Sequence, residues 1–166
     1  MRNDPEYDIR YSEPDDLKFL QSWLSGPEAL WNFPATDARE MEIMSNFWIG
    51  FSRFKSSLTA TYGKTPCGIA TLFLMPYKKV AHHALFYMIV DPAFRHQGVG
   101  ESLIKNIKHL AKTRFRLEIL QIEIWEDNLP MVHLLERHGF SVMMKQKGYV
   151  KENSLYRARI IYKARL

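Results

Sequence analysis

The spacing of apolar residues along the chain predicts helices and strands in alternation. Apolar side chains in 17–24 recur every three or four residues, which is the period of a helix, and Gly26-Pro27 would end that helix. Ser12 is followed by an acid, a proline and a second acid, so it is the candidate N-terminal cap. A second helix is expected over 37–51. Residues 28–33, which Pro34 interrupts, show no clear period.

Strands and further helices follow in the rest of the chain. Apolar runs bounded by turn residues predict strands at 7–11, 58–62, 68–75, 81–90, 117–125, 142–150 and 154–163. The segment 84–90 is apolar on both faces, as expected for a strand that is covered on both sides. The helix that begins after Gly100 makes 81–125 a βαβ unit with parallel strands. Asn128 would cap the next helix, and Gly139 would end it.

Composition narrows the class of protein. A chain of 166 residues suits one domain, 1–166, and an apolar content of 46% excludes a disordered chain. The single cysteine, Cys67, excludes an internal disulfide and a cysteine-based zinc site. The net charge of +5 favours anionic ligands such as phosphates. Basic and acidic residues are mixed along the chain, which argues against a dedicated nucleic-acid binder.

The sequence gives no sign of export, membrane insertion or metal binding. Residues 1–8 are polar and acidic, unlike a signal peptide, and no apolar run approaches the roughly 20 residues of a membrane span. We therefore expect a cytoplasmic protein with no membrane partner. His82 and His83 are adjacent and would face opposite sides of a strand, so no metal site is predicted.

Residues 90–100, VDPAFRHQGVG, contain the most specific pattern in the chain. They follow an apolar strand and open an amphipathic helix, whose first N–H groups have no partner within the helix. Gly98 and Gly100 lack a Cβ atom, so a ligand can approach the backbone closely. Arg95 and His96 add side-chain donors. This combination suits a pyrophosphate group.

Two common phosphate-binding motifs do not match this loop. Gly100 is followed by Glu101 and Ser102, whereas a P-loop needs lysine and then serine or threonine. The dinucleotide fingerprint needs a third glycine where this chain has Leu103. The pattern Arg-x-x-Gly-x-Gly resembles instead the acetyl-CoA loop of the GNAT superfamily of N-acetyltransferases. Residues 126–140, EDNLPMVHLLERHGF, resemble that family's second signature, an asparagine, a helix and then Gly-Phe.

The resemblance implies a fold and a cofactor site. The fold would be α/β (α+β), a mixed, mostly antiparallel sheet with a central parallel βαβ unit flanked by helices. Acetyl-CoA would lie where strands 84–90 and 120–125 separate. The implied contacts are Met88, Ile89 and Val90 with the pantetheine arm, Arg95, His96, Gln97, Gly98, Val99 and Gly100 around the pyrophosphate, Ser102 beside it, and Asn128 on the arm. Asn128 could equally be a plain helix cap, or serve in both roles.

The implied activity is transfer of an acetyl group from acetyl-CoA to a primary amine, by direct attack in a ternary complex. The acceptor would be a small molecule or a protein N-terminus. Glu123 is the first candidate base, because strand alternation separates it from Leu120, Ile122 and Ile124 and a mid-strand carboxylate is disfavoured unless solvated or used. It also matches the position of a base proposed in similar N-terminal-amine acetyltransferases. The alternative is a solvated strand residue.

The general acid is less clear from the sequence. Many family members have a tyrosine where this chain has Leu135, which cannot donate a proton. Tyr87 is our choice, while three other proton donors stay open, and so does departure of the thiolate without a protein acid. The three others are Tyr149, Tyr156 and His133. The missing tyrosine also motivates an alternative function, a catalytically silent domain that binds acetyl-CoA as a sensor or adaptor.

The region before residue 51 would meet the acceptor, according to the resemblance. Its aromatic residues and nearby carboxylates could bind a cationic amine, or the aromatic residues could simply belong to the core. The aromatic residues in question are Trp23, Trp31, Phe33 and Trp48. An exposed last strand would also allow a homodimer by strand pairing.

Overall fold

The computed structural model describes residues 7–166, which form one sheet of seven strands with helices on both faces. The strands are β1 (Asp8–Tyr11), β2 (Ser57–Tyr62), β3 (Thr65–Leu74), β4 (His83–Val90), β5 (Ile119–Trp125), β6 (Ser141–Glu152) and β7 (Leu155–Arg165). The helices are α1 (Leu17–Leu24), α2 (Pro27–Asn32), α3 (Ala38–Gly50), α4 (Val99–Thr113) and α5 (Leu129–Arg137). Each strand predicted from the sequence is present, and its ends differ by a few residues.

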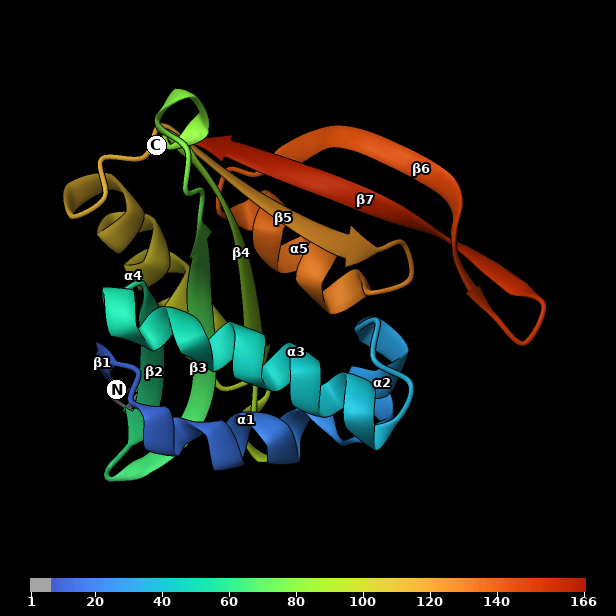
Figure 1. The fold of residues 1–166 in the computed structure, drawn as a ribbon, viewed down its shortest axis with the longest axis horizontal. Helices are drawn as coiled ribbons and strands as arrows, with labels where there is room; N and C mark the ends of the chain where they lie inside the picture. The colour runs from blue at the N-terminus through green and yellow to red at the C-terminus, as the bar shows by residue number, and fades with distance from the viewer. Residues whose placement is uncertain (1–6) are drawn as a thin grey trace, which may run out of the picture.

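The strand order is β1-β2-β3-β4-β5-β7-β6 (Figure 1). Strands β4 and β5 are parallel, and every other pair of neighbours in the sheet is antiparallel. The parallel pair is joined through α4, as the βαβ prediction required. The observed fold therefore confirms the mixed, mostly antiparallel sheet with a central parallel unit.

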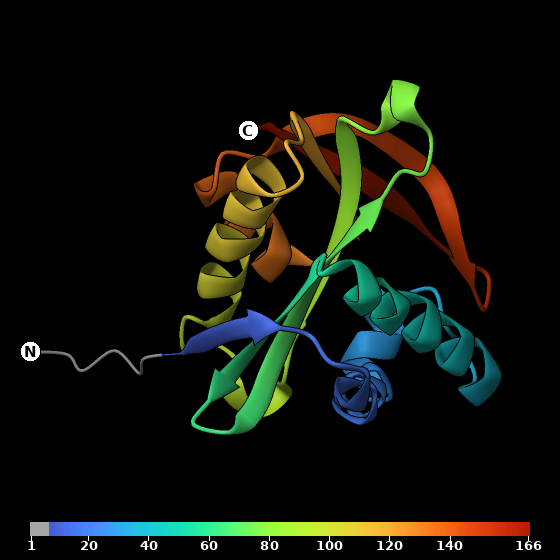
Figure 2. The same ribbon diagram turned by 60° about the vertical axis from the view of Figure 1, so that its left-hand side comes forward.

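The helices form two layers, one on each face of the sheet. Figure 2 shows α4 on one face and the group α1–α3 on the other. Helix α4 packs on β2, β3 and β4, whereas α1 contacts β4 and α3 contacts β3. The β6–β7 hairpin reaches beyond the rest of the sheet (Figure 1), and nearly every residue of β6 is exposed. The α1–α3 layer thus leaves this end of its face open.

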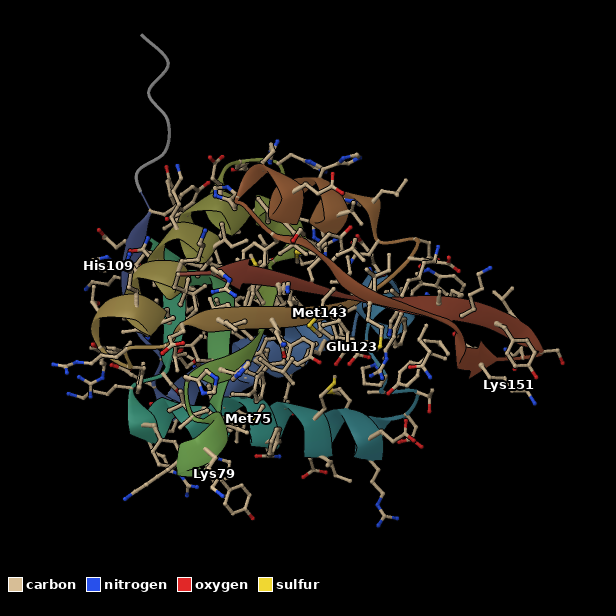
Figure 3. The ribbon with its side chains drawn as sticks, turned by 90° about the horizontal axis from the view of Figure 1, so that it is seen from above. Met75, Lys79, His109, Glu123, Met143 and Lys151 are labelled. Atoms are coloured by element: carbon tan, nitrogen blue, oxygen red, sulfur yellow. The ribbon has the colours of Figure 1, made fainter. Side chains whose placement is uncertain are left out.

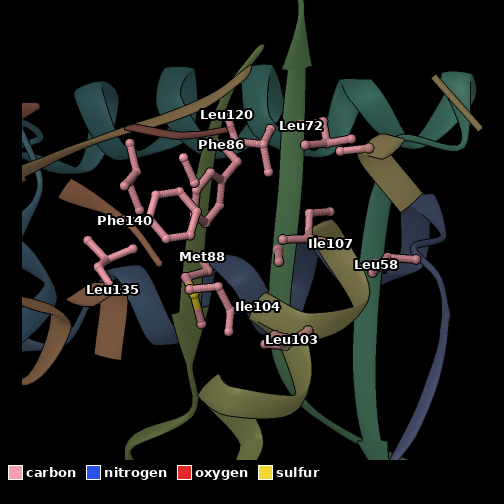
Figure 4. Close-up of a cluster of buried hydrophobic side chains, with 14 of the residues drawn as sticks. Leu58, Leu72, Phe86, Met88, Leu103, Ile104, Ile107, Leu120, Leu135 and Phe140 are labelled. Atoms are coloured by element: carbon pink, nitrogen blue, oxygen red, sulfur yellow. The ribbon is translucent and has the colours of Figure 1, made fainter. Parts of the chain in front are cut away.

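The main core lies between α4 and the centre of the sheet (Figure 4). Leu103, Ile104 and Ile107 project from α4 against Phe86 of β4 and Leu120 of β5, and each of them is fully buried. Burial of one such side chain contributes about 1.5 to 3 kcal/mol. The start of α4 and the ends of β4 and β5 are therefore held on a rigid base.

Two local interpretations of the sequence change. Ser12 is not the helix cap, because Glu13 takes that position and the Ser12 hydroxyl lies 2.8 Å from the hydroxyl of Thr59 in a buried pair. The ambiguous segment 28–33 belongs largely to a short helix, α2, which has a proline at its start.

Of the aromatic residues considered for the acceptor side, Trp23 and Trp48 are core residues, only 5% and 2% exposed.

Within residues 7–166, no helix is both long enough and apolar enough to cross a membrane.

Candidate active site

Strands β4 and β5 pair over a short distance and then separate. Their register covers His83↔Ile119, Ala84↔Leu120 and Leu85↔Gln121. Beyond these pairs, β4 continues beside β3 as far as Val90, and β5 continues beside β7 as far as Trp125. The sheet therefore opens between its two central strands, at the end where the glycine loop begins.

A cavity of about 710 Å³ lies at this opening, within the usual range for a small-molecule site. Nine of the eleven residues expected to bind the cofactor line it. They are Met88, Ile89, Val90, Arg95, His96, Gly98, Val99, Gly100 and Asn128. The structure thus brings together residues from the end of β4, the glycine loop, the start of α4 and the start of α5.

The local sequence explains the shape of the loop. The Asp91 carboxylate accepts a hydrogen bond of 2.9 Å from the Ala93 amide, which starts a tight turn after β4. His96 and Gly98 have positive φ values of 59° and 87°, which turn the chain into α4. A Cβ atom on Gly100 would lie 3.3 Å from Leu134 and 3.5 Å from Met88. The absence of a side chain at Gly100 therefore keeps space open between the first turn of α4 and the side chains of Leu134 and Met88.

Gln97 and Ser102 do not line the cavity. The Gln97 amide donates to the Ala93 carbonyl at 3.2 Å on the exposed side of the loop. Ser102 lies in the first turn of α4, where its backbone N–H donates to the Gly98 carbonyl at 3.0 Å. Asn128 stands at the N-cap position of α5, but its side chain makes no capping hydrogen bond. Its amide is therefore available to the cavity.

Sequence reasoning missed part of the cavity wall. Pro130, Met131, Leu134 and Arg137 line it from one face of α5, and their helical spacing was a usable signal. Helix α2 contributes Glu28, whose carboxylate forms an ion pair with Arg95. These two residues are 67 positions apart, so no local pattern could pair them.

Glu123 and Tyr87 do not line this cavity; they lie on the face of the sheet that carries the α1–α3 layer (Figure 3). The expected alternation holds, because Leu120, Ile122 and Ile124 are buried while Glu123 is 21% exposed. Figure 3 shows Glu123 pointing into the space between α3 and the β5–β7 part of the sheet. The Arg159 guanidinium donates to its carboxylate at 3.4 Å.

The Tyr87 hydroxyl belongs to the same cluster. Its ring packs against Trp48 and Phe73, at centroid distances of 6.1 and 5.3 Å. Burial raises the pKa of Tyr87 far above its usual value, and the nearby Glu123 carboxylate raises it further. Tyr87 is therefore protonated at any ordinary pH and can act only as a proton donor.

The other proposed proton donors are placed differently. Tyr149 of β6 lies over the Arg159 guanidinium at 3.9 Å, close to Tyr87 and Glu123. Tyr156 is 57% exposed in the outer part of the β6–β7 hairpin, and His133 is exposed on α5. Leu135 is fully buried in the main core. Among residues 7–166, no group of three His, Cys, Asp or Glu side chains is arranged to hold a metal ion.

Comparison with known proteins gives consistent results. The L-amino acid N-acetyltransferase AaaT of Escherichia coli (strain K12) is 22% identical over 89 residues, which are 54% of this chain and 55% of that protein. The chain thus aligns with about half the length of this relative.

Two solved structures share the fold over nearly the whole chain. A GNAT-family acetyltransferase from Streptococcus pneumoniae superposes with a TM-score of 0.77 at 22% identity, covering 97% of this chain and 100% of that one. YncA from Salmonella typhimurium, solved with its cofactor acetyl-CoA, gives a TM-score of 0.76 at 16% identity, covering 96% and 94%. The model of the acetyltransferase (GNAT) family matches residues 17–140, which include both motifs. The chain therefore belongs to the GNAT family of acetyltransferases.

Proposed function

We propose that the protein is an N-acetyltransferase that moves the acetyl group of acetyl-CoA to a primary amine, by direct attack in a ternary complex. The observation that carries this proposal is the cavity between β4 and β5, with the glycine loop and the first turn of α4 in its wall. Membership of the GNAT family supports it, because both family motifs contribute to that wall.

The wall of the cavity fits the parts of acetyl-CoA. Backbone N–H groups at 98–100, at the start of α4, would bind the pyrophosphate together with Arg95 and His96. Met88, Ile89 and Val90 would offer backbone groups to the pantetheine arm, since β5 has moved away from this part of β4. The free amide of Asn128 would contact the same arm. Gln97 and Ser102 lie just outside the cavity, and their contact with the cofactor stays a prediction.

Transfer requires the acceptor amine to lose a proton before it attacks. Glu123 takes that proton, directly or through a water molecule, because its partly exposed carboxylate lies on the open face. The neutral nitrogen then bonds to the thioester carbonyl carbon. The C–S bond breaks, and its electron pair leaves with sulfur. The nitrogen loses its second proton in this step, which replaces the proton that the thiolate receives. The products are an N-acetyl amine and CoA.

Tyr87 would give a proton to the departing thiolate, a role supported by its protonated hydroxyl beside Glu123. The charge of Glu123 opposes ionisation of Tyr87 in the resting protein. Once Glu123 has accepted the proton of the amine, that charge is neutralised and Tyr87 becomes a better acid. The two residues would therefore act in sequence, base first and acid second.

Calorimetric titration with acetyl-CoA, with ATP as a control ligand, tests the cofactor site. Gly98→Leu combined with Gly100→Leu should abolish acetyl-CoA binding. Gly63→Leu is the control for the Gly98 change, because both glycines have a positive φ and open space where a Cβ would lie, but Gly63 is in the β2–β3 turn. Unchanged binding in the Gly98 and Gly100 variant would remove the loop from the cofactor site.

Screening of an amine panel then tests the chemistry. Glu123→Gln should lower kcat at least tenfold while acetyl-CoA binding stays the same, and the exposed Glu118→Gln should change neither. Tyr87→Phe should lower kcat with no change in acetyl-CoA affinity. Tight binding of acetyl-CoA without transfer to any amine would favour the alternative, a silent sensor or adaptor.

A further inference from the structure

A fixed ion pair stands on the open face of the sheet, where the acceptor must approach. Arg159 of β7 donates through Nη1 to Glu123 of β5 at 3.4 Å, and both side chains are about one-fifth exposed. Glu123 is the base in the proposed function, but that role does not require an arginine. The Arg159 guanidinium is therefore available for a separate role.

The guanidinium of Arg159 is held in one orientation. Its Nε donates to the Gln146 side chain at 3.0 Å, and the Tyr149 ring covers one of its flat sides at 3.9 Å. Within the described part of the chain, its hydrogen bonds use Nε and Nη1 and leave Nη2 available. The remaining donor, Nη2 of a guanidinium fixed in this way, is suited to a carboxylate.

The neighbouring arginine of the same strand shows the contrast. Arg157 is 5% exposed, and its two terminal nitrogens are already occupied. One donates to Asp127 at 3.1 Å, and the other donates to the Trp31 carbonyl at 2.8 Å. Arg157 therefore ties α2 to β7, whereas Arg159 keeps a donor free for a ligand.

The charge of this region selects among acceptor classes. A plain ammonium that approaches Glu123 also approaches Arg159, so attraction and repulsion largely cancel. The β6–β7 hairpin adds further positive charge, which disfavours a polyamine. Besides Arg159, the basic residues of the two strands are Lys145, Lys147, Lys151, Arg157, Lys163 and Arg165, against the single acid Glu152. Of these, Lys145 pairs with Glu126, and Arg157 pairs with Asp127 and Glu152.

A zwitterion meets the opposite situation. An ammonium on Glu123 and an adjacent carboxylate on Arg159 would each find a complementary charge, and the two side chains are close enough for one small molecule to reach both. A protein N-terminus has no carboxylate beside its amine. We propose that the acceptor is a free α-amino acid, whose carboxylate is bound by Arg159. This inference rests on the proposed acetyltransferase function.

Exposed apolar side-chain surface lies near the Glu123–Arg159 pair. Met143 of β6 is 43% exposed and receives a hydrogen bond from the Gln121 amide at 3.4 Å. Gln121 is two residues before Glu123 on the same face of β5, and Figure 3 labels Met143 next to Glu123. The partly exposed ring of Tyr149 lies on the other side of Arg159. An aliphatic amino acid such as leucine is therefore the first probe.

Three amines with the same side chain test the proposal, namely L-leucine, L-leucinamide and isoamylamine. With the wild-type protein, kcat/KM for leucine should exceed that for the other two by at least tenfold, although leucinamide has the less basic and more readily deprotonated amine. Arg159→Gln should abolish this preference by lowering kcat/KM for leucine. The value for leucinamide should stay within about threefold, and acetyl-CoA binding should not change.

Control variants separate recognition from general charge. Lys163→Gln removes an exposed cation from the same strand and should leave the preference for leucine intact. Arg159→Lys keeps the charge but loses the donor fixed at Nη2, so it should restore only part of the preference.

The same assays distinguish failure of the amino-acid proposal from failure of the proposed acetyltransferase function. Transfer to leucinamide or isoamylamine at least as fast as to leucine would overturn the amino-acid proposal and leave the acetyltransferase standing. Equal losses for all three amines in Arg159→Gln would also overturn it, because Arg159 would then act only on Glu123. Acetyl-CoA binding without transfer to any amine would overturn both proposals.

Discussion

The ion pair between Arg95 and Glu28 predicts that replacing the Glu28 carboxylate with a neutral group strengthens acetyl-CoA binding. Arg95 belongs to the glycine loop, whereas Glu28 reaches it from α2 across the cavity. A pyrophosphate would compete with Glu28 for the guanidinium. Glu28→Gln should therefore lower the Kd for acetyl-CoA, because the loop arginine is released and a negative charge leaves the cavity wall.

The size of the effect follows from exposure. The side chain of Glu28 is 62% exposed and that of Arg95 is 26% exposed, so the pair belongs to the exposed class. Such pairs contribute about 0.2 to 1 kcal/mol, which corresponds to a decrease in Kd of about 1.4-fold to fivefold. Arg95→Gln removes a charged hydrogen bond to the ligand, worth about 1.5 to 3 kcal/mol, and should raise Kd by about tenfold to a hundredfold.

Calorimetry with acetyl-CoA at low and high salt measures both changes. The gain from Glu28→Gln should shrink as salt screens the pair, and it should be smaller when Arg95 is already glutamine. Weaker binding by Glu28→Gln would refute the reasoning, since Glu28 would then hold Arg95 in place for the ligand.

Three further predictions concern stability. Leu135→Ala should cost about 2 to 5 kcal/mol in denaturant unfolding, because the side chain is fully buried; a cost below 1 kcal/mol would contradict the packing. Burial alone would raise the pKa of Asp16, but hydrogen bonds from Arg10, the Glu13 amide and Thr59 lower it overall. The ionised Asp16 carboxylate therefore stabilises the folded state above about pH 4, and this stabilisation is lost as pH falls through the lowered pKa. Asp16→Asn should lower the free energy of unfolding by about 1 to 3 kcal/mol and flatten its acid dependence, measured by denaturant unfolding at a series of pH values. Burial, with a smaller effect of Asp91, raises the pKa of Cys67 to about 11, so stability should fall as pH rises from 9 to 11 in the wild type and should fall less in Cys67→Ala.

The sequence predicted most of the sheet because its strands carry strong local signals. The run 84–90 is continuous and apolar, and 120–124 alternates between apolar and polar residues, so both strands and the faces of β5 could be assigned from the sequence. The glycine loop was also readable, since its glycines and Arg95 fall within a few residues of a helix start.

The parts that could not be predicted depend on distant contacts. Helix α2 is only six residues long, and packing rather than periodicity decides its structure. Ser12 had the composition of a cap, but its hydroxyl is used by a buried partner 47 positions away. The pairing of Glu123 with Arg159 depends on the register of β5 and β7, which no local pattern determines.

The separation of β4 from β5 has a consequence for how this protein can change over time. A ligand that lies between the two strands is recognised by main-chain atoms, and a substitution at Met88, Ile89 or Val90 leaves those atoms in place. In the proposed function the acceptor is met by side chains of β5 and β7, namely Glu123 and Arg159. Substitutions there can alter acceptor choice without touching the main chain that serves the cofactor. In the proposed function, cofactor binding thus depends on the backbone, whereas acceptor choice depends on side chains that can change.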